Sequence, residues 1–141
     1  MEYYETTIEI EAAPEQIWPI LSDVSNYPNW DSGVLAIEGR AEPGEKLKLT
    51  SEANPKRAFS IRVKEIRPNE GMRWEGGMPL GLFKGVRTYK LHPKNGGGTT
   101  FTMREEYTGP MLKMIWKSMP DLQPSFDKFA RGLKARAEAR A

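Results

Sequence analysis

Six short segments rich in β-forming residues follow one another between residues 34 and 108, and only turn residues separate them. The turns are Glu42-Pro43-Gly44, Asn54-Pro55, Pro68 to Gly71, and the run Asn95 to Gly98. Consecutive strands joined by such short turns favour an antiparallel meander. The six segments are 34–38, 46–52, 57–67, 72–75, 82–92 and 99–108.

Residues 3–11 alternate between two faces, with Tyr4, Thr6, Ile8 and Ile10 on one of them. This period of two predicts a further strand with one buried side. Pro14 suits the first position of a short helix, since its missing N–H is not needed there. Ser22 or Asp23 can cap a second short helix, which the pair Tyr27-Pro28 is expected to end.

The C-terminal segment changes period. Apolar residues recur at spacings of four, three, four and four from Leu122 to Ala137, which predicts a long amphipathic helix. An apolar stripe before it, from Met111 to Met119, predicts a short helix, and Pro120 and Pro124 are expected to break or kink the chain between the two. The fold class is therefore α+β, with about seven curved antiparallel strands wrapped round the long helix and two short helices after the first strand.

The composition narrows the choice of function. The 141 residues, with no composition break, predict one domain (1–141) that buries about 70% of its unfolded surface. No cysteine and a single histidine, His92, argue against a zinc site, and we expect neither a metal nor a cofactor. No signal peptide or long apolar span is evident, so we expect a cytoplasmic protein without stable membrane insertion.

Several motifs together resemble one family. They are Ala13-Pro14-Glu15-Gln16-Ile17-Trp18, Tyr27-Pro28-Asn29-Trp30, Met72-Arg73-Trp74-Glu75-Gly76, Phe83 to Leu91, Gly97 to Phe101 and Glu105 to Gly109. In this order they resemble the START-related, polyketide cyclase/dehydrase-like superfamily of helix-grip proteins, often labelled SRPBCC. The resemblance covers essentially the whole chain. It implies a cavity between the sheet and the long helix, used by relatives for lipids, sterols and polyketides, but it implies little about chemistry.

Two strands carry the most informative pattern. One face of the strand at 82–92 carries Phe83, Gly85, Arg87, Tyr89 and Leu91. One face of the strand at 99–108 carries Phe101, Met103, Glu105 and Tyr107. The apolar members mark these faces as inward. If the glycine-rich turn pairs Leu91 with Phe101, Arg87 lies opposite Glu105.

An inward charge pair has two explanations. It can be a polar anchor for a ligand in an apolar cavity, with Arg87 gripping a carboxylate, enolate or carbonyl group. It can equally be a structural pair near the mouth. The superfamily often has a histidine where Arg87 stands, which weakens any transfer of acid–base chemistry. The expected ligand-binding residues are Trp30, Met72, Trp74, Phe83, Arg87, Tyr89, Phe101, Met103, Glu105, Trp116 and Phe126.

Three functions remain open. The first is binding or carriage of a small hydrophobic molecule, lipid- or polyketide-like. The second is a cyclase, dehydratase or aromatase in which Glu105 or Tyr89 transfers protons. The third is a co-chaperone-like interaction module that uses the basic C-terminal segment, where seven Lys and Arg stand against three Asp and Glu from Met111 onward. We expect no nucleic-acid partner, and a homodimer is left open.

Overall fold

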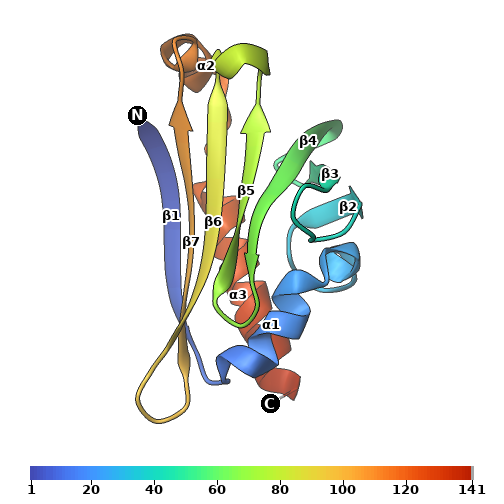
Figure 1. Ribbon diagram of the computed structural model, residues 1–141, viewed down its shortest axis with the longest axis vertical. Helices are drawn as coiled ribbons and strands as arrows, with labels where there is room; N and C mark the ends of the chain where they lie inside the picture. The colour runs from blue at the N-terminus through green and yellow to red at the C-terminus, as the bar shows by residue number, and fades with distance from the viewer. Residues whose placement is uncertain (141) are drawn as a thin grey trace.

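The computed structural model describes residues 1–140, which form seven strands and three α-helices (Figure 1). The strands are β1 (Glu2–Ile10), β2 (Val34–Glu38), β3 (Lys46–Ser51), β4 (Asn54–Arg67), β5 (Gly71–Gly77), β6 (Lys84–Pro93) and β7 (Thr99–Thr108). The helices are α1 (Pro14–Ser22), α2 (Leu112–Ser118) and α3 (Gln123–Arg140), with 3₁₀ helices η1 (Val24–Asn29) and η2 (Pro79–Gly81).

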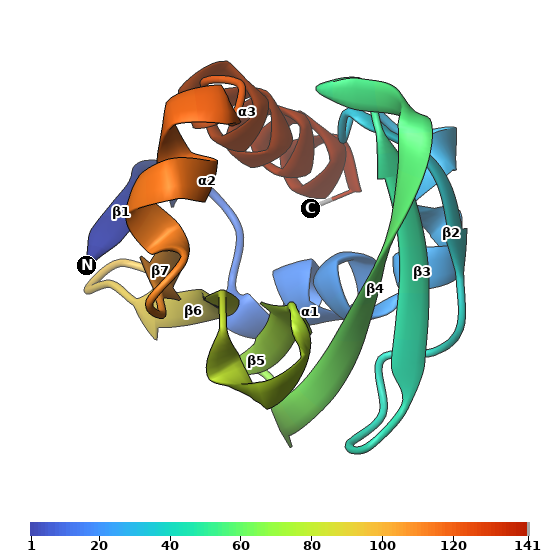
Figure 2. The ribbon, with the colours of Figure 1, turned by 90° about the horizontal axis from the view of Figure 1, so that it is seen from above.

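All seven strands belong to one antiparallel sheet in the order β1-β7-β6-β5-β4-β3-β2. Viewed from above, the sheet curves round α3 from β1 on one side to β2 on the other (Figure 2). The strong curvature follows from the twist of the long strands and from bulges in the β2–β3, β3–β4 and β4–β5 pairs. The α+β helix-grip prediction is confirmed.

The predicted elements are recovered with small shifts at their ends. β4 begins at Asn54 rather than residue 57, because the residues beside the β3–β4 turn already pair. Pro28 lies inside η1 instead of ending it, since a 3₁₀ turn tolerates proline there, and Asp23 makes no capping hydrogen bond from its side chain. Pro124 falls in the first turn of α3, where the missing N–H has no intrahelical partner to lose.

The core lies between the concave face of the sheet and the inner side of α3. From α3 it receives Phe126, Phe129, Leu133 and Ala137, four of the five residues whose spacing predicted the helix, and all four are buried. Each large apolar side chain removed from water contributes roughly 1.5–3 kcal/mol to stability. This face therefore holds α3 in the curve of the sheet.

One glycine on α3 permits a very close contact with the segment after η1. A Cβ added at Gly132 would lie 2.0 Å from the backbone carbonyl oxygen of Asp31 and 3.2 Å from the Trp30 ring. No side chain fits in that space. Gly132 thus fixes how closely the segment after η1 packs on the helix, although glycine is costly within a helix.

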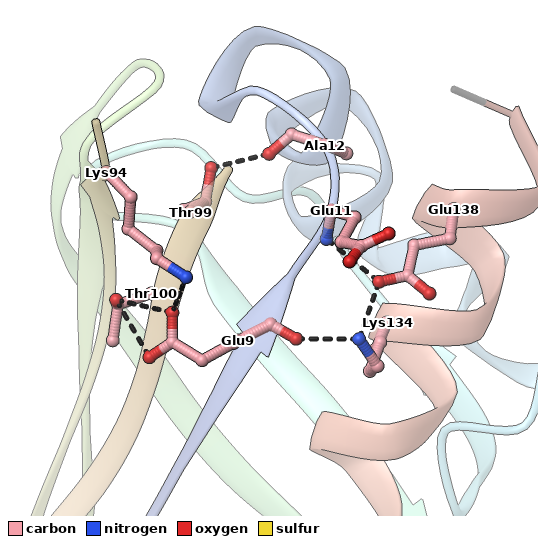
Figure 3. A network of polar contacts seen from close by, with 8 residues as sticks. All are labelled: Glu9, Glu11, Ala12, Lys94, Thr99, Thr100, Lys134 and Glu138. Atoms are coloured by element: carbon pink, nitrogen blue, oxygen red, sulfur yellow. Dashed lines mark hydrogen bonds and ion pairs between the residues drawn. The ribbon is translucent and has the colours of Figure 1, made fainter. Parts of the chain in front are cut away.

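Polar contacts tie α3 to β1 and to the loop that follows it (Figure 3). Lys134 Nζ donates to the Glu9 carbonyl oxygen at 2.8 Å, and the Glu11 backbone N–H donates to Glu138 Oε2 at 2.8 Å. Lys134 and Glu138 also pair with each other at 2.6 Å. Nearer the start of the helix, Gln123 Nε2 donates to the Glu5 carbonyl oxygen at 2.9 Å. Side chains of α3 therefore meet the backbone of this segment along most of its length.

Candidate functional site

A cavity of about 790 Å³ lies between the concave face of the sheet and α3. Strands β3 to β7 supply most of its wall, and α2, α3, η1, the start of β2 and the connecting segments supply the rest. The volume is within the range of about 300–1,000 Å³ that small-molecule sites occupy. Its position follows from the fold, because a strongly curved sheet and a straight helix separate where the sheet bends away.

The deep wall is apolar and aromatic. Trp74, Tyr89, Met103, Phe126 and Phe129 all line the cavity and are buried. Trp74 and Tyr89 meet edge to face with ring centroids 5.0 Å apart, and Tyr89 also packs on Phe129 at 5.7 Å. Such contacts between rigid rings give the wall a defined shape.

Arg87 and Glu105 lie on this wall as a direct pair, as the predicted register requires. β6 and β7 pair Leu91 with Phe101 and Arg87 with Glu105. Arg87 Nε donates to Glu105 Oε1 at 2.5 Å, and the side chains are 20% and 16% exposed. The guanidinium carbon also lies 5.0 Å from the centre of the Phe126 ring, a cation–π contact that places the charge against α3.

Burial, with the added negative charge of Glu105, keeps the tyrosines beside the pair protonated, although Arg87 acts in the opposite direction. Burial lowers the pKa of Arg87, but the negative charge of Glu105 and the nearby Tyr89 and Tyr107 outweigh it, so the pKa rises above its ordinary value. Burial also raises the pKa of Tyr89 and of Tyr107, and Glu105 raises both further. At neutral pH both phenols are therefore hydrogen-bond donors.

Free donors remain around this pair. Arg87 Nη1 donates to the Tyr89 hydroxyl oxygen at 3.4 Å, which leaves the Tyr89 proton available, and Arg87 Nη2 makes no hydrogen bond within residues 1–140. The indole N–H of Trp74 and the hydroxyl of Tyr107 are buried with no partner in the same residues. A buried polar group left unpaired costs about 1–3 kcal/mol, so the cavity favours a ligand that brings acceptors.

Gly85 makes room for the pair inside the cavity. A Cβ at this position would lie 3.1 Å from Glu105 Oε2 and 3.4 Å from the Tyr107 ring. The backbone there is not in the left-handed region, so the reason for a glycine is space rather than conformation. Gly85 thus sets the width of the cavity beside the charged pair.

The sequence-predicted residues divide into two groups. Seven of the eleven line the cavity, namely Trp74, Phe83, Arg87, Tyr89, Met103, Glu105 and Phe126. The structure places the other four elsewhere. Met72 and Phe101 are buried in the core below the cavity. Trp30 packs on Tyr27 and Phe129. Trp116 packs on Tyr4 and on Tyr107, with ring centroids 5.2 Å and 5.6 Å apart.

Several lining residues were not among the predicted site residues. Tyr107 and Phe129 share the inward faces whose periodicity was recognised, so the pattern contained them. Tyr27 also lines the cavity, and its hydroxyl donates to the Leu21 carbonyl oxygen at 2.5 Å. The residues at the start of β4, from Arg57 to Ser60, carry no signal of this kind, because they are exposed on both faces.

The mouth of the cavity is marked by its exposed lining residues. These come from only three places, which are the start of β4, the β5–β6 turn and the α2–α3 connection. They are Arg57, Ala58, Phe59, Ser60, Gly77, Met78, Ser118 and Pro120. The cavity therefore opens at the end of the molecule that carries α2, away from the C-terminus (Figure 1).

The single histidine lies outside the cavity wall. His92 is exposed near the end of β6, as expected for a turn histidine. Within residues 1–140, no three His, Asp or Glu side chains gather in an arrangement that could hold a metal ion. None of the helices in this range is both long and apolar enough to cross a membrane.

Structural comparison finds the same fold in proteins of low sequence identity. An aromatase/cyclase, ZhuI, from Streptomyces sp. R1128 aligns with a TM-score of 0.75 at 12% identity, over 99% of this chain and 94% of that one. A START superfamily protein from Mycobacterium smegmatis gives 0.69 at 21% identity, and a protein from Thermus thermophilus gives 0.74 at 19%, each over 99% of both chains.

These likenesses establish the fold, and the sequence comparison establishes the family. No curated protein sequence matches the chain significantly. Residues 1–138, however, match the family described as "Polyketide cyclase / dehydrase and lipid transport", which includes every residue of the cavity wall. The chain therefore belongs to the polyketide cyclase/dehydrase and lipid transport family, and it shares its fold with a START superfamily protein and an aromatase/cyclase.

Proposed function

We propose that this protein binds a small hydrophobic molecule in the cavity between the sheet and α3, and that Arg87 holds a carbonyl, enolate or carboxylate group of that molecule. The observation that supports this proposal most directly is the largely apolar cavity of about 790 Å³, with the Arg87–Glu105 pair on its wall. Small-molecule sites usually have this composition, with a few polar groups that orient an otherwise apolar ligand.

The hydrogen-bonding groups favour a ligand rich in oxygen acceptors. Arg87 Nη2, the Tyr89 hydroxyl and the Tyr107 hydroxyl can all donate, whereas Glu105 Oε1 is occupied by Arg87 Nε. Because Glu105 already balances the charge of Arg87, a neutral carbonyl compound meets no unbalanced charge. Polyketide-like and lipid-like molecules with keto or ester groups have the required chemistry.

The first experiment is native mass spectrometry of the purified protein, followed by extraction and identification of any bound molecule. A discrete apolar molecule with carbonyl or carboxyl oxygens is the expected result. The second is titration with Nile red, an uncharged apolar probe. A protein that carries no small molecule and does not bind the dye would refute the proposal.

A matched pair of variants tests whether the binding is in this cavity. Gly85→Leu places a side chain beside Glu105 and Tyr107, and it should abolish the co-purified molecule and dye binding. Ala36→Leu places a leucine on the exposed surface of β2 and should leave both unchanged. Equal binding by both variants would place the ligand outside the cavity.

Catalysis of a cyclisation, dehydration or aromatisation is a second candidate, favoured by the free proton of Tyr89 beside Arg87. In that reaction the wall would fold the substrate, Arg87 would stabilise a developing enolate, and Tyr89 would donate the proton. Tyr89→Phe and Glu105→Gln should then abolish turnover of the identified molecule while sparing its binding. Retained turnover in both would remove the catalytic role.

The interaction-module alternative has less support. Two of the basic residues on which it relied are used within the fold, since Lys128 pairs with Glu52 at 2.6 Å and Lys134 pairs with Glu138. Arg131 and Arg140 remain exposed without an ion pair among residues 1–140. They provide a direct control for charge-dependent binding at α3.

A further inference from the structure

The mouth of the cavity is bordered by three segments, which we call the rim: residues 53–60, 76–84 and 109–120. They lie at one end of the molecule, where α2, the β5–β6 turn and the start of β4 are drawn at the top of Figure 1. The β5–β6 turn is fastened to the start of α2, because the Met111 backbone N–H donates to the Leu82 carbonyl oxygen at 2.9 Å. Gly109 allows the same carbonyl to approach, as a Cβ there would lie 2.5 Å from it.

The rim exposes large apolar side chains. Leu80 is 97% exposed and Met114 is 62% exposed, and they are accompanied by Phe59, Met78 and Leu82. Five of the eight exposed large apolar residues in the described chain thus surround a single opening. Clustering of this kind marks an interaction surface, whereas isolated exposed apolar residues are ordinary.

Leu80 is also held in an unfavourable backbone conformation. Its φ is 61° and its ψ is 22°, in the left-handed region, which bulky non-glycine residues rarely occupy. In this conformation the Leu80 side chain points into solvent at the tip of the turn, where it buries almost no surface against the rest of the fold. A strained residue with an exposed apolar side chain suggests selection for something outside the chain.

The charge of the rim has one sign. It contains Lys56, Arg57, Lys84, Lys113 and Lys117, and all 19 acidic residues of the chain lie outside it. Lys84 pairs with Glu75 at 3.2 Å, but the other four make no ion pair within residues 1–140. Exposed apolar tips beside unpaired cations suit a bilayer with anionic headgroups.

We propose that the rim docks on the surface of an anionic lipid bilayer, with Leu80 and Met114 inserted among the lipids and the lysines at the headgroups. The cavity mouth then faces the membrane. This docking is peripheral and adds to the proposed ligand binding without depending on it, since neither Leu80 nor Met114 lines the cavity. It uses the rim rather than the basic C-terminal helix.

Flotation with vesicles tests the docking. The full chain is mixed with vesicles of phosphatidylcholine alone or of phosphatidylcholine with phosphatidylglycerol. Binding should occur only with the anionic vesicles and should fall as salt is added, because the lysines contribute through screened attraction. Absence of binding to anionic vesicles, or equal binding to both kinds, would overturn the proposal whatever the cavity contains.

Leu80→Asn separates docking from folding. Asparagine tolerates the left-handed region, so this variant should be at least as stable as the wild type. It should nevertheless bind anionic vesicles about tenfold more weakly, since a leucine side chain no longer leaves water. Leu35→Asn changes an exposed leucine of β2 outside the rim and should bind as the wild type does.

Charge reversal identifies the surface. Lys113→Glu with Lys117→Glu should weaken binding by about thirtyfold or more, on the scale of individual lysines at an anionic surface. Arg131→Glu with Arg140→Glu makes the same charge change on α3 and should have little effect. Wild-type binding by the α2 double variant, or loss of binding in the α3 variant, would refute docking through the rim.

Discussion

Replacing Arg87 and Glu105, singly and together, separates the contribution of this pair to stability from its contribution to binding. The side chains are only 20% and 16% exposed, and Nε and Oε1 are 2.5 Å apart. With charge centres about 4 Å apart and an effective dielectric constant of about 20, the attraction is about 4 kcal/mol. Removing one partner leaves the other charge largely buried.

We expect Arg87→Met and Glu105→Leu each to lower the free energy of unfolding by about 2–3 kcal/mol, which is less than for a fully buried pair because the cavity admits water. In thermal unfolding this corresponds to a decrease of about 8–12 °C. The double variant should unfold within about 1 kcal/mol of the wild type, because two apolar side chains replace the pair at similar volume. The coupling free energy is then about 4 kcal/mol.

Urea denaturation of the four proteins measures this cycle, and the exposed pair Arg40 and Glu45, at 3.7 Å, is the matched control with an expected coupling below about 1 kcal/mol. If the double variant loses as much stability as the two single variants combined, the reasoning about a shielded pair is wrong. The double variant also gives a functional result. Its restored stability should be accompanied by loss of the bound molecule, because the cation that is proposed to hold the ligand has been removed.

Three further predictions concern other parts of the fold. Gly132→Ala should destabilise the protein by about 2–4 kcal/mol in urea denaturation, since its Cβ would meet the Asp31 carbonyl oxygen at 2.0 Å; a loss below about 1 kcal/mol would show that η1 can move away. The Glu11 backbone N–H and then Lys134 lower the pKa of Glu138, so the carboxylate stabilises the fold above the ordinary value of 4.5 and this contribution disappears as the pH falls through the lower folded value. Glu138→Gln should therefore be less stable than the wild type at pH 7, the two should converge in acid, and a constant difference at every pH would contradict the argument. Tyr27→Phe should cost about 1 kcal/mol, because the buried Leu21 carbonyl oxygen loses its donor, whereas an unchanged melting temperature would mean that another group replaces it.

Much of the fold could be predicted because its signals are local. The alternation in β1, β6 and β7 determines which side chains face inward, and the turn between β6 and β7 sets the register that places Arg87 opposite Glu105. The spacing along α3 identifies its buried face in the same way.

The candidate site was harder to predict, because periodicity gives the direction of a side chain but not its depth along the strand. Phe101 and Tyr89 both face inward, yet Phe101 fills the core below the cavity while Tyr89 lines it. The boundary between them is set by where the curved sheet leaves α3, which depends on all seven strands. Trp116 illustrates the same difficulty, since it lies on α2 against Tyr4 and Tyr107 and does not line the cavity.

The contacts between α3 and the β1 segment have a consequence for solubility. β1 is one of the two edge strands of the sheet, and the side of its backbone turned away from β7 would otherwise be free to pair with another chain. Lys134 and Glu138 instead occupy backbone groups of Glu9 and Glu11 (Figure 3). Gln123 does the same for the Glu5 carbonyl oxygen. The helix that closes the cavity thus also acts as a guard against strand addition. Any event that lifts α3 from the sheet would therefore expose a nine-residue template for aggregation at the same moment that it opened the interior.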